Sequence, residues 1–314
     1  MPMQRRDLLT CLPLPSVAQA QASPLRIVVP FSAGSGTDNT ARVFSDALRR
    51  ATGSTVIVDN KPGGGTVIGS QEVSRSRPDG TTVLYTTGGH TTSGVLMRNL
   101  PYDPVSGFTA ITMLSRGSGF ALIVPSTSRY QTLQAFLAAA KAEPGKLTYG
   151  SSGNGNTTHV IAALFCRSAG IEMTHIPYKA TPVADLLTGT IDSMFVSPSI
   201  VMSYLKEGRL RALGVSSRAR MAELPDAATF GEIGVDADIP AWSGFWGPPM
   251  MPTDVVDGLY RRIAQAARTP AFETYTRDNG GDIVLMPPDG FSRYVAGEIE
   301  RYRKLLPSLG IQMD

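Results

Sequence analysis

The chain has 314 residues, of which 42% are hydrophobic and 18% are charged, and its formal net charge is +3. This is the composition of an ordinary globular protein whose length suits two domains, and it excludes a disordered or fibrous chain. The basic residues form no run of five or more, so the sequence lacks the patterns typical of binding to nucleic acid or to a membrane surface.

The first 22 residues have the pattern of a secretory signal peptide, and we expect export to the periplasm. Arg5 and Arg6 precede a short apolar stretch at 8–17, and two overlapping Ala-x-Ala cleavage sites lie within 18–22. A basic, an apolar and a cleavable segment in this order direct secretion. The arginine pair followed by Asp-Leu-Leu also resembles a twin-arginine signal, and both export routes stay open. No apolar run reaches the ~20 residues that cross a bilayer, so we expect a soluble mature protein.

The two cysteines are not expected to form a disulfide. Cys11 lies within the signal peptide, and Thr10 before it is bulkier than the residue that usually precedes a lipid-attachment cysteine. Removal of the signal leaves Cys166 alone, in a pattern typical of a buried helix face. We therefore expect the burial of apolar side chains, and no covalent link, to stabilise the fold.

The first part of the mature chain alternates apolar strands with helices. An apolar stripe with helical spacing follows Asp38 and ends before Gly53, which indicates a helix. Thr37 or Asp38 can cap the start of this helix. We expect strands at residues 25–30, 55–58 and 82–85, and helices at 37–51 and 68–76.

The later part repeats this alternation, which indicates sheets of mainly parallel strands covered by helices. We expect strands at residues 120–125, 146–149, 173–176, 191–195, 211–215 and 242–246, and helices at 133–142, 157–169, 183–188, 200–207, 255–267 and 291–306.

This organisation predicts an α/β protein of two lobes, each an open, mostly parallel sheet flanked by helices. Residues 23–122 and 217–314 are expected to form the first lobe, and residues 123–216 the second, inserted lobe. Crossing strands near Val124 and Val215 would act as a hinge. Because open sheets bind ligands at the carboxyl ends of their strands, we expect the ligand between the lobes.

Three of the expected strands end in loops of small hydroxyl and glycine residues. Two of these loops lead directly into helices, whose unpaired N–H groups form an anion site when glycine allows close approach. Any single loop of this kind also fits a simple capped turn; their repetition at successive strand ends favours binding. The candidate residues are Ser32, Ala33, Gly34, Ser35, Gly36 and Thr37, then Thr86, Thr87 and Gly88, and then Ser151, Ser152, Gly153, Asn154, Asn156 and Thr157.

Catalytic and metal-binding patterns are weak. Asn154 stands where a Gly-x-Ser-x-Gly elbow around Ser152 requires its second glycine. The glycine loops match neither a P-loop nor the full dinucleotide fingerprint. His90, His159 and His175 are far apart and lack metal-ligand spacing. We therefore expect a binding protein without catalytic residues, metal or cofactor.

A series of short motifs resembles the substrate-binding proteins of tripartite tricarboxylate transporters, the Bug or TctC-type family. Each motif is weak alone, but together they follow the family order along nearly the whole mature chain. The matching segments are 27–31 with Gly34, Thr37 and Asp38, then 58–63, 68–69, 78–80, 100–104, 149–153 with Gly155 and His159, 175–179, 210–213 and 224–226.

The resemblance implies a two-lobed periplasmic binding protein of the Venus-flytrap type, with a small organic carboxylate as its ligand. It further implies delivery of that acid to the membrane components of a tripartite tricarboxylate-type transporter, and we expect a monomer. A sensory co-receptor that uses the same pocket is an alternative that the sequence does not separate from transport. An enzyme acting on small organic acids is a further alternative.

In the family the ligand carboxylate lies between the loop after the first strand and a facing loop of the second lobe. Here these loops are residues 31–37 and 151–158, with contributions expected from 86–89 and 178–181. The resemblance therefore adds Phe31, His159, Tyr178, Lys179, Ala180 and Thr181 to the candidate site.

The sequence departs from the family pattern at three places. Ser35 replaces the second glycine of the first loop, and residues 180–182, Ala-Thr-Pro, shorten the loop after Lys179. Ser197, also a candidate ligand residue, follows Val196 where many members carry Asp or Asn. The loss of that side chain removes a partner for a ligand amino group, so we expect an acid that is not an amino acid.

Overall fold

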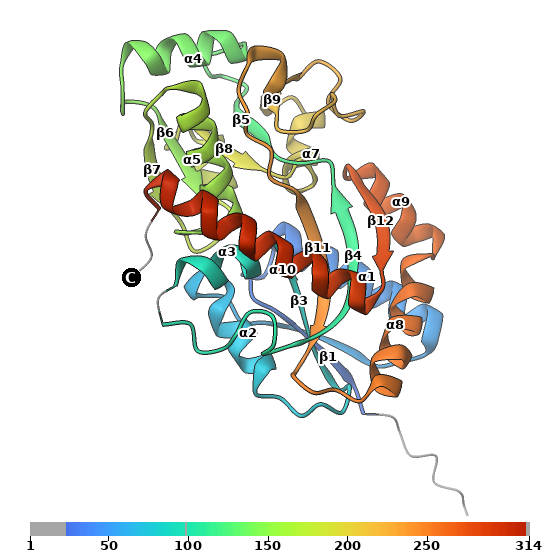
Figure 1. Ribbon diagram of the computed structural model, residues 1–314. Coiled ribbons are helices and arrows are strands. Elements are labelled where there is room, and N and C mark those ends of the chain that lie inside the picture. The colour runs from blue at the N-terminus through green and yellow to red at the C-terminus, as the bar shows by residue number, and fades with distance from the viewer. Residues whose placement is uncertain (1–22, 98, 312–314) are drawn as a thin grey trace, which may run out of the picture.

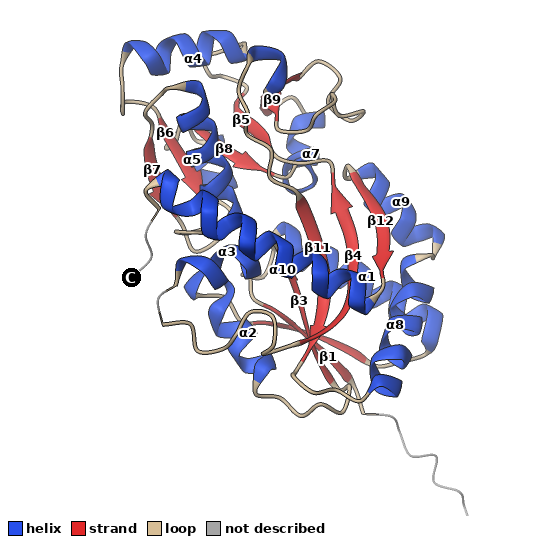
Figure 2. Cartoon of the chain, viewed as in Figure 1, coloured by secondary structure: helices blue, strands red, loops and turns tan. Residues whose placement is uncertain are grey.

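The computed structural model describes residues 23–97 and 99–311, and the expected signal peptide lies outside them. The chain forms two lobes, each built on a six-stranded sheet (Figures 1 and 2). The first sheet has the order β12 (Gly281–Met286), β4 (Thr109–Gly117), β11 (Ala241–Gly247), β3 (Thr82–Thr87), β1 (Leu25–Val29), β2 (Val56–Asn60). The second has the order β10 (Ala228–Thr229), β9 (Leu210–Val215), β5 (Ala121–Pro125), β8 (Ser193–Val196), β6 (Thr148–Ser151), β7 (Thr174–Pro177).

The two-lobed α/β fold is confirmed, and both sheets contain antiparallel strands beside their parallel ones. In the first sheet β1 runs parallel to β2 and β3, whereas β11 is antiparallel to β3 and β4. In the second sheet β5 is antiparallel to β8 and β9. The strands β5 and β11 follow the two connections between the sheets, so each enters its sheet from the other lobe and runs against its neighbours.

The first lobe buries apolar side chains on both faces of its sheet. On one face lies α1 (Gly36–Thr52), together with α8 (Thr253–Ala267) and α9 (Pro270–Asp278). The centre of the Phe44 ring on α1 lies 5.0 Å from the ring centre of Phe245 in β11 and 5.2 Å from that of Phe272 in α9. On the other face lie α2 (Val67–Ser74), α3 (Gly89–Leu96) and α10 (Pro288–Leu305). The strongly apolar stripe of α1 thus explains how β1 and its following loop are held in place.

The second lobe has its own aromatic core. Phe165 on α5 (Thr157–Ala169) lies 5.1 Å from Phe195 in β8 and 4.7 Å from Phe230, ring centre to ring centre. The remaining helices of this lobe are α4 (Leu133–Ala142), α6 (Val183–Leu187) and α7 (Pro198–Lys206). Cys166 is a half-buried residue of α5 and has no disulfide partner within the described part of the chain.

The lobes are connected by residues 118–120 and by a second segment that ends just before β11. The lobe boundaries stay a prediction, but packing favours a second crossing nearer 240 than 216, because β10 pairs with β9 and Ile239 lies in the second core. The expected hinge residues Val124 and Val215 lie inside strands of the second sheet. A third link is α10, which starts on the first lobe and places Tyr302 in the second core (Figure 1).

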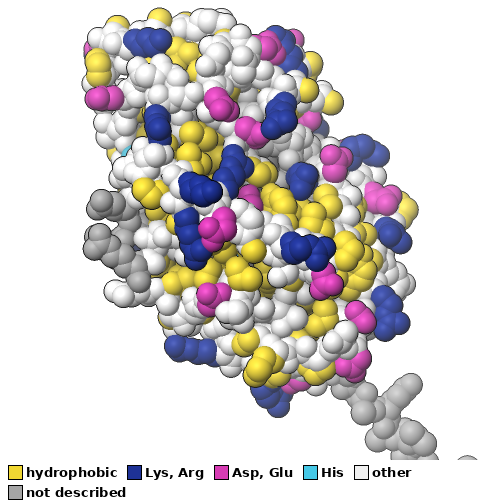
Figure 3. All heavy atoms as spheres, viewed as in Figure 1, with side chains coloured by type: hydrophobic (Ala, Val, Ile, Leu, Met, Phe, Trp, Pro, Cys, Tyr) yellow, Lys and Arg dark blue, Asp and Glu magenta, His cyan; other side chains and the backbone are white. Residues whose placement is uncertain are grey.

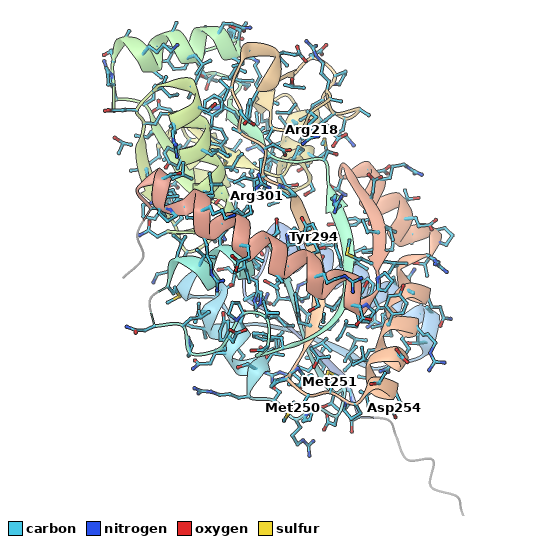
Figure 4. The ribbon with its side chains drawn as sticks, in the orientation of Figure 1. Arg218, Met250, Met251, Asp254, Tyr294 and Arg301 are labelled. Atoms are coloured by element: carbon cyan, nitrogen blue, oxygen red, sulfur yellow. The ribbon has the colours of Figure 1, made fainter. Side chains whose placement is uncertain are left out.

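The surface beside α10 mixes apolar and charged side chains (Figure 3). Two arginines from different elements reach Asp238, just before β11: the Arg301 guanidinium donates to the Asp238 carbonyl at 2.6 Å, and Arg218 lies 3.7 Å from the Asp238 carboxylate. Figure 4 shows Arg301 and Tyr294 along α10. In the described residues, no helix is both long and apolar enough to cross a membrane.

Candidate ligand-binding site

A cavity of about 160 Å³ lies between the two sheets and is lined by residues of both lobes. The starts of three helices border it: Gly36 and Thr37 of α1, Gly88 before α3, and Thr157 of α5. The first N–H groups of a helix have no intrahelical partner, so each start presents donors to whatever occupies the cavity. Three such starts at one cavity make it suited to a negatively charged group.

The loop that leads into α1 is organised by the buried carboxylate of Asp38. This carboxylate accepts hydrogen bonds from the Gly34 N–H at 2.8 Å, from Arg42 Nε at 2.9 Å and from Asn60 Nδ2 at 2.9 Å. Burial disfavours its ionised form, but the bonds from Arg42, Gly34 and Asn60 outweigh burial and lower the pKa of Asp38. Ser35, the residue that departs from the family glycine, is the N-cap of α1 and accepts from the Asp38 N–H at 3.2 Å.

The loop that leads into α5 is held by its own side chains. Asn156 Oδ1 accepts from the Thr158 N–H at 3.1 Å, and Thr158 Oγ1 accepts from the Ser152 N–H at 2.9 Å. Thr157 is 6% exposed, and its hydroxyl has no hydrogen-bond partner among the described residues. A buried hydroxyl without a partner at the wall of a cavity is free to bond to a ligand or to water.

The starts of α3 and α5 approach each other across the lobes. A Cβ atom at Gly88 would lie 3.2 Å from Thr157 Oγ1 and 3.6 Å from Trp242 Nε1. A Cβ atom at Gly89 would lie 3.4 Å from Asn156 Nδ2. The glycines at the end of β3 therefore allow the backbone of the first lobe to approach the second-lobe loop closely.

The first-lobe wall of the cavity is fixed by buried hydrogen bonds. The Tyr85 hydroxyl donates to Ser243 Oγ at 2.9 Å, and Ser243 Oγ lies 2.8 Å from Ser115 Oγ. Beside them, Trp242 Nε1 donates to the carboxylate of Glu298 on α10 at 2.7 Å. This network sets the positions of the side chains that line the cavity at β4 and β11.

The two histidines of the second lobe lie behind the binding loop. Their rings stack with centres 3.8 Å apart, His159 Nδ1 accepts from the Gly155 N–H at 3.1 Å, and His175 Nε2 lies 2.6 Å from Ser151 Oγ. Burial, followed by the charge of His175, lowers the pKa of His159 to about 3, and burial lowers the pKa of His175 to about 4. Both rings are neutral at pH 7, and they support the loop instead of lining the cavity.

Half of the sequence-predicted residues line the cavity. These are Phe31, Ser35, Gly36, Thr37, Thr87, Gly88, Ser152, Asn156, Thr157, Thr181 and Ser197. The others lie in the same loops or next to them without lining it: Ser32, Ala33, Gly34, Thr86, Ser151, Gly153, Asn154, His159, Tyr178, Lys179 and Ala180. Of these, Tyr178 bonds to Asp185 at 2.6 Å. Their part in binding remains a prediction.

Sequence reasoning missed lining residues from several other segments. Among them are Tyr85 on β3, Ser115 and Arg116 on β4, Phe120 before β5, Ile200 on α7, Trp242 and Ser243 on β11, and Tyr275 on α9. Neither β4 nor α9 was expected, and the strand at β11 was expected without any indication that its start borders the cavity. The signal that was available is small: Ser115 and Gly117 at the end of an apolar run.

Comparison with known proteins places these features in one family. Residues 40–311 match the family described as the tripartite tricarboxylate transporter family receptor. The UPF0065 protein of the tcbD–tcbE intergenic region of Pseudomonas sp. (strain P51) is 31% identical over 287 residues, which cover 90% of this chain and 85% of that protein.

Two solved structures are similar over nearly the whole chain. The periplasmic binding protein BugD is 27% identical, has a TM-score of 0.88, and is matched over 93% of this chain and 99% of its own. A protein of R. palustris whose structure was solved with adipate is also 27% identical, with a TM-score of 0.88 and coverage of 94% and 99%.

Proposed function

The chain belongs to the family of tripartite tricarboxylate transporter receptors, and we propose that it captures a small organic carboxylate between its lobes for such a transporter. Its relatives include periplasmic solute-binding proteins, and one similar structure was solved with adipate. The observation that carries the proposal is the convergence of three helix starts on one cavity.

The electrostatics of the cavity favour an anion. The backbone N–H groups at the starts of α1 and α5 and the positive ends of these helices attract a carboxylate without a basic side chain. None of the residues that line the cavity is Asp or Glu, and the nearby carboxylate of Asp38 is paired with Arg42. The unpartnered hydroxyl of Thr157 supplies a further donor. The proposed carboxylate site is therefore formed by the backbone N–H groups at the helix starts, those of Gly36 and Thr37 on α1 and of Thr157 on α5.

Catalysis is not required to explain this arrangement. The residues lining the cavity include no His, Cys, Lys, Asp or Glu, so no side chain there is an ordinary general base or nucleophile other than a hydroxyl. The nearest Ser–His pair, Ser151 and His175, is committed to the support of the loop. We propose that the ligand leaves the site chemically unchanged.

Delivery of the acid requires a membrane partner and export. We propose that the first 22 residues direct the chain to the periplasm, where it acts as a monomer that closes by rotation about residues 118–120 and the segment before β11. Co-purification of the tagged protein with integral membrane components of a transporter supports transport. Co-purification with a membrane kinase instead supports the sensory role.

The binding function is tested by isothermal titration calorimetry with acids and their amides. We expect at least one small acid to bind and its amide, which has the same shape without the charge, to bind at least ~100-fold more weakly. Mass spectrometry is expected to recover the acid unchanged. Equal binding of acid and amide contradicts the carboxylate site, and conversion of the acid contradicts a purely receptor role.

A further inference from the structure

We propose that the ligand is a monocarboxylate with a compact apolar body, about the size of one six-membered ring. This inference rests on the proposed function and narrows it to a substrate class. Outside the helix starts, small polar residues such as Ser115 and Ser199 alternate with large apolar and aromatic side chains from both lobes, which are Phe31, Phe120, Ile200, Trp242 and Tyr275. Such a wall stabilises an apolar ligand body, and aromatic rings favour another ring by offset or edge-on packing.

The charges at the cavity match one carboxylate better than two. The starts of α3 and α5 lie together, since a Cβ at Gly88 would be 3.2 Å from Thr157 Oγ1, so they contribute to a single anion site. Arg116 is the one charged residue among the lining residues of the described chain. It is exposed, and its guanidinium carbon lies 5.5 Å from the ring centre of Tyr294 on α10, so a carboxylate that pairs with it would stay at the solvent edge of the cavity. A second carboxylate buried against the apolar part of the wall would have no charged partner, and an unpaired buried charge is strongly unfavourable.

The size of the cavity sets the size of the ligand body. An apolar cavity of about 150 Å³ holds one benzene molecule, and the cavity here measures about 160 Å³. One ring fills this space while its carboxylate reaches the helix starts. A ligand hydroxyl group that faces Phe120 or Ile200 would find no side-chain hydrogen-bond partner there.

The test compares matched acids by calorimetry on the purified, extensively dialysed protein. Benzoate is compared with phthalate, which adds a second carboxylate to the same ring. Hexanoate is compared with adipate, which has the same chain length and a second acid group. We expect benzoate and cyclohexanecarboxylate to bind at least ~10-fold more tightly than phthalate, and hexanoate more tightly than adipate.

The outcomes separate this inference from the proposed function. Tighter binding of adipate, phthalate or malate than of every monocarboxylate overturns the inference and leaves the carboxylate receptor standing. Binding of no acid overturns both. A substitution in the wall provides a second test: Ile200→Thr keeps the branch at Cβ but replaces the ethyl group by a hydroxyl, and is expected to weaken benzoate binding about tenfold through loss of apolar contact.

The matched control is Ile57→Thr, because Ile57 is 50% exposed on β2 and does not line the cavity. This variant is expected to bind benzoate as the wild type does. Unchanged affinity in Ile200→Thr, with a correctly folded protein, contradicts the role of the apolar wall.

Discussion

Ile200 of the second lobe lies over Gly36 of the first, and a Cβ atom added at position 36 would stand 2.3 Å from Ile200 Cγ1. Gly36 is the first residue of α1 and does not have a left-handed backbone conformation. The glycine is therefore required by the approach of the other lobe and not by its own backbone. This contact couples the start of α1, which is part of the proposed carboxylate site, to the closure of the lobes.

We predict that Gly36→Ala weakens ligand binding at least ~10-fold, because the added methyl group holds Ile200 and the second lobe away from α1. Ile200→Ala in the same chain removes the clashing atoms and is expected to restore part of the affinity. The control is Gly258→Ala on α8, where a Cβ meets no atom within 4 Å. Calorimetry of the four proteins measures the coupling. Additive effects of the two substitutions would refute the contact as the cause.

Removal of the Asp38 carboxylate is expected to disorganise the loop before α1. Asp38→Ala leaves the Gly34 N–H without its acceptor and removes one of the two acceptors of Asn60 Nδ2, and it should cost about 2–4 kcal/mol of unfolding free energy. Ligand affinity is expected to fall as well. Asp46→Ala on the same helix is the control, because Asp46 forms only an exposed ion pair with Arg49 worth well under about 1 kcal/mol. Urea unfolding and calorimetry distinguish the two variants.

Glu298 is predicted to make stability fall as the pH rises. Burial raises its pKa despite the hydrogen bonds from Trp242 and Tyr294. Its neutral form is therefore favoured in the folded state, and stability is lost as the pH increases from the unfolded pKa through the raised folded pKa. In Glu298→Gln this loss of stability should disappear, because glutamine does not titrate. The structure should be kept, because the glutamine carbonyl still accepts a hydrogen bond from Trp242. Unfolding free energies between about pH 4 and pH 8 test this, and identical pH profiles would contradict it.

Glu298→Ala separates positioning from charge. It leaves Trp242 Nε1, at the cavity wall, without an acceptor and should cost about 1–3 kcal/mol. If Glu298 acts by placing the Trp242 ring, the alanine variant loses ligand affinity and the glutamine variant retains it. Equal affinity in both variants means that the ring is placed by packing alone.

His90 is predicted to contribute to loss of stability in acid. Its ring is buried, Nε2–H donates to the Pro104 carbonyl at 2.8 Å, and burial lowers its pKa to about 4. The neutral ring is favoured in the folded state, so stability is lost as the pH falls from about 6.5 towards 4, by up to about 3 kcal/mol. His90→Gln does not titrate and should flatten this part of the profile. An unchanged acid profile would contradict the assignment.

Local sequence patterns were sufficient for the loops but not for the walls of the site. The loops before α1 and α5 could be identified because their capping residues and glycines are close together in the chain, as with Ser35 and Asp38 or Asn156 and Thr158. The resemblance to the receptor family, which the comparisons confirm, supplied the facing arrangement of these loops.

The walls depend on pairing over long distances in the sequence. Ser115 and Ser243 meet only because β4 and β11 are adjacent in the first sheet, which no local pattern indicates. Tyr275 reaches the cavity from α9, a short helix of nine residues. Ile200 was expected on a helix, but its position over Gly36 depends on how the two lobes close together.

The most direct test of the carboxylate site is a crystal structure of the protein with the acid that binds most tightly. We predict that the ligand carboxylate lies within about 3 Å of a backbone nitrogen at the start of α1 and of one at the start of α5, with the ligand body against Phe120 and Ile200. A carboxylate bound to Arg116 away from the helix starts, or a ligand outside the cavity, would contradict the account.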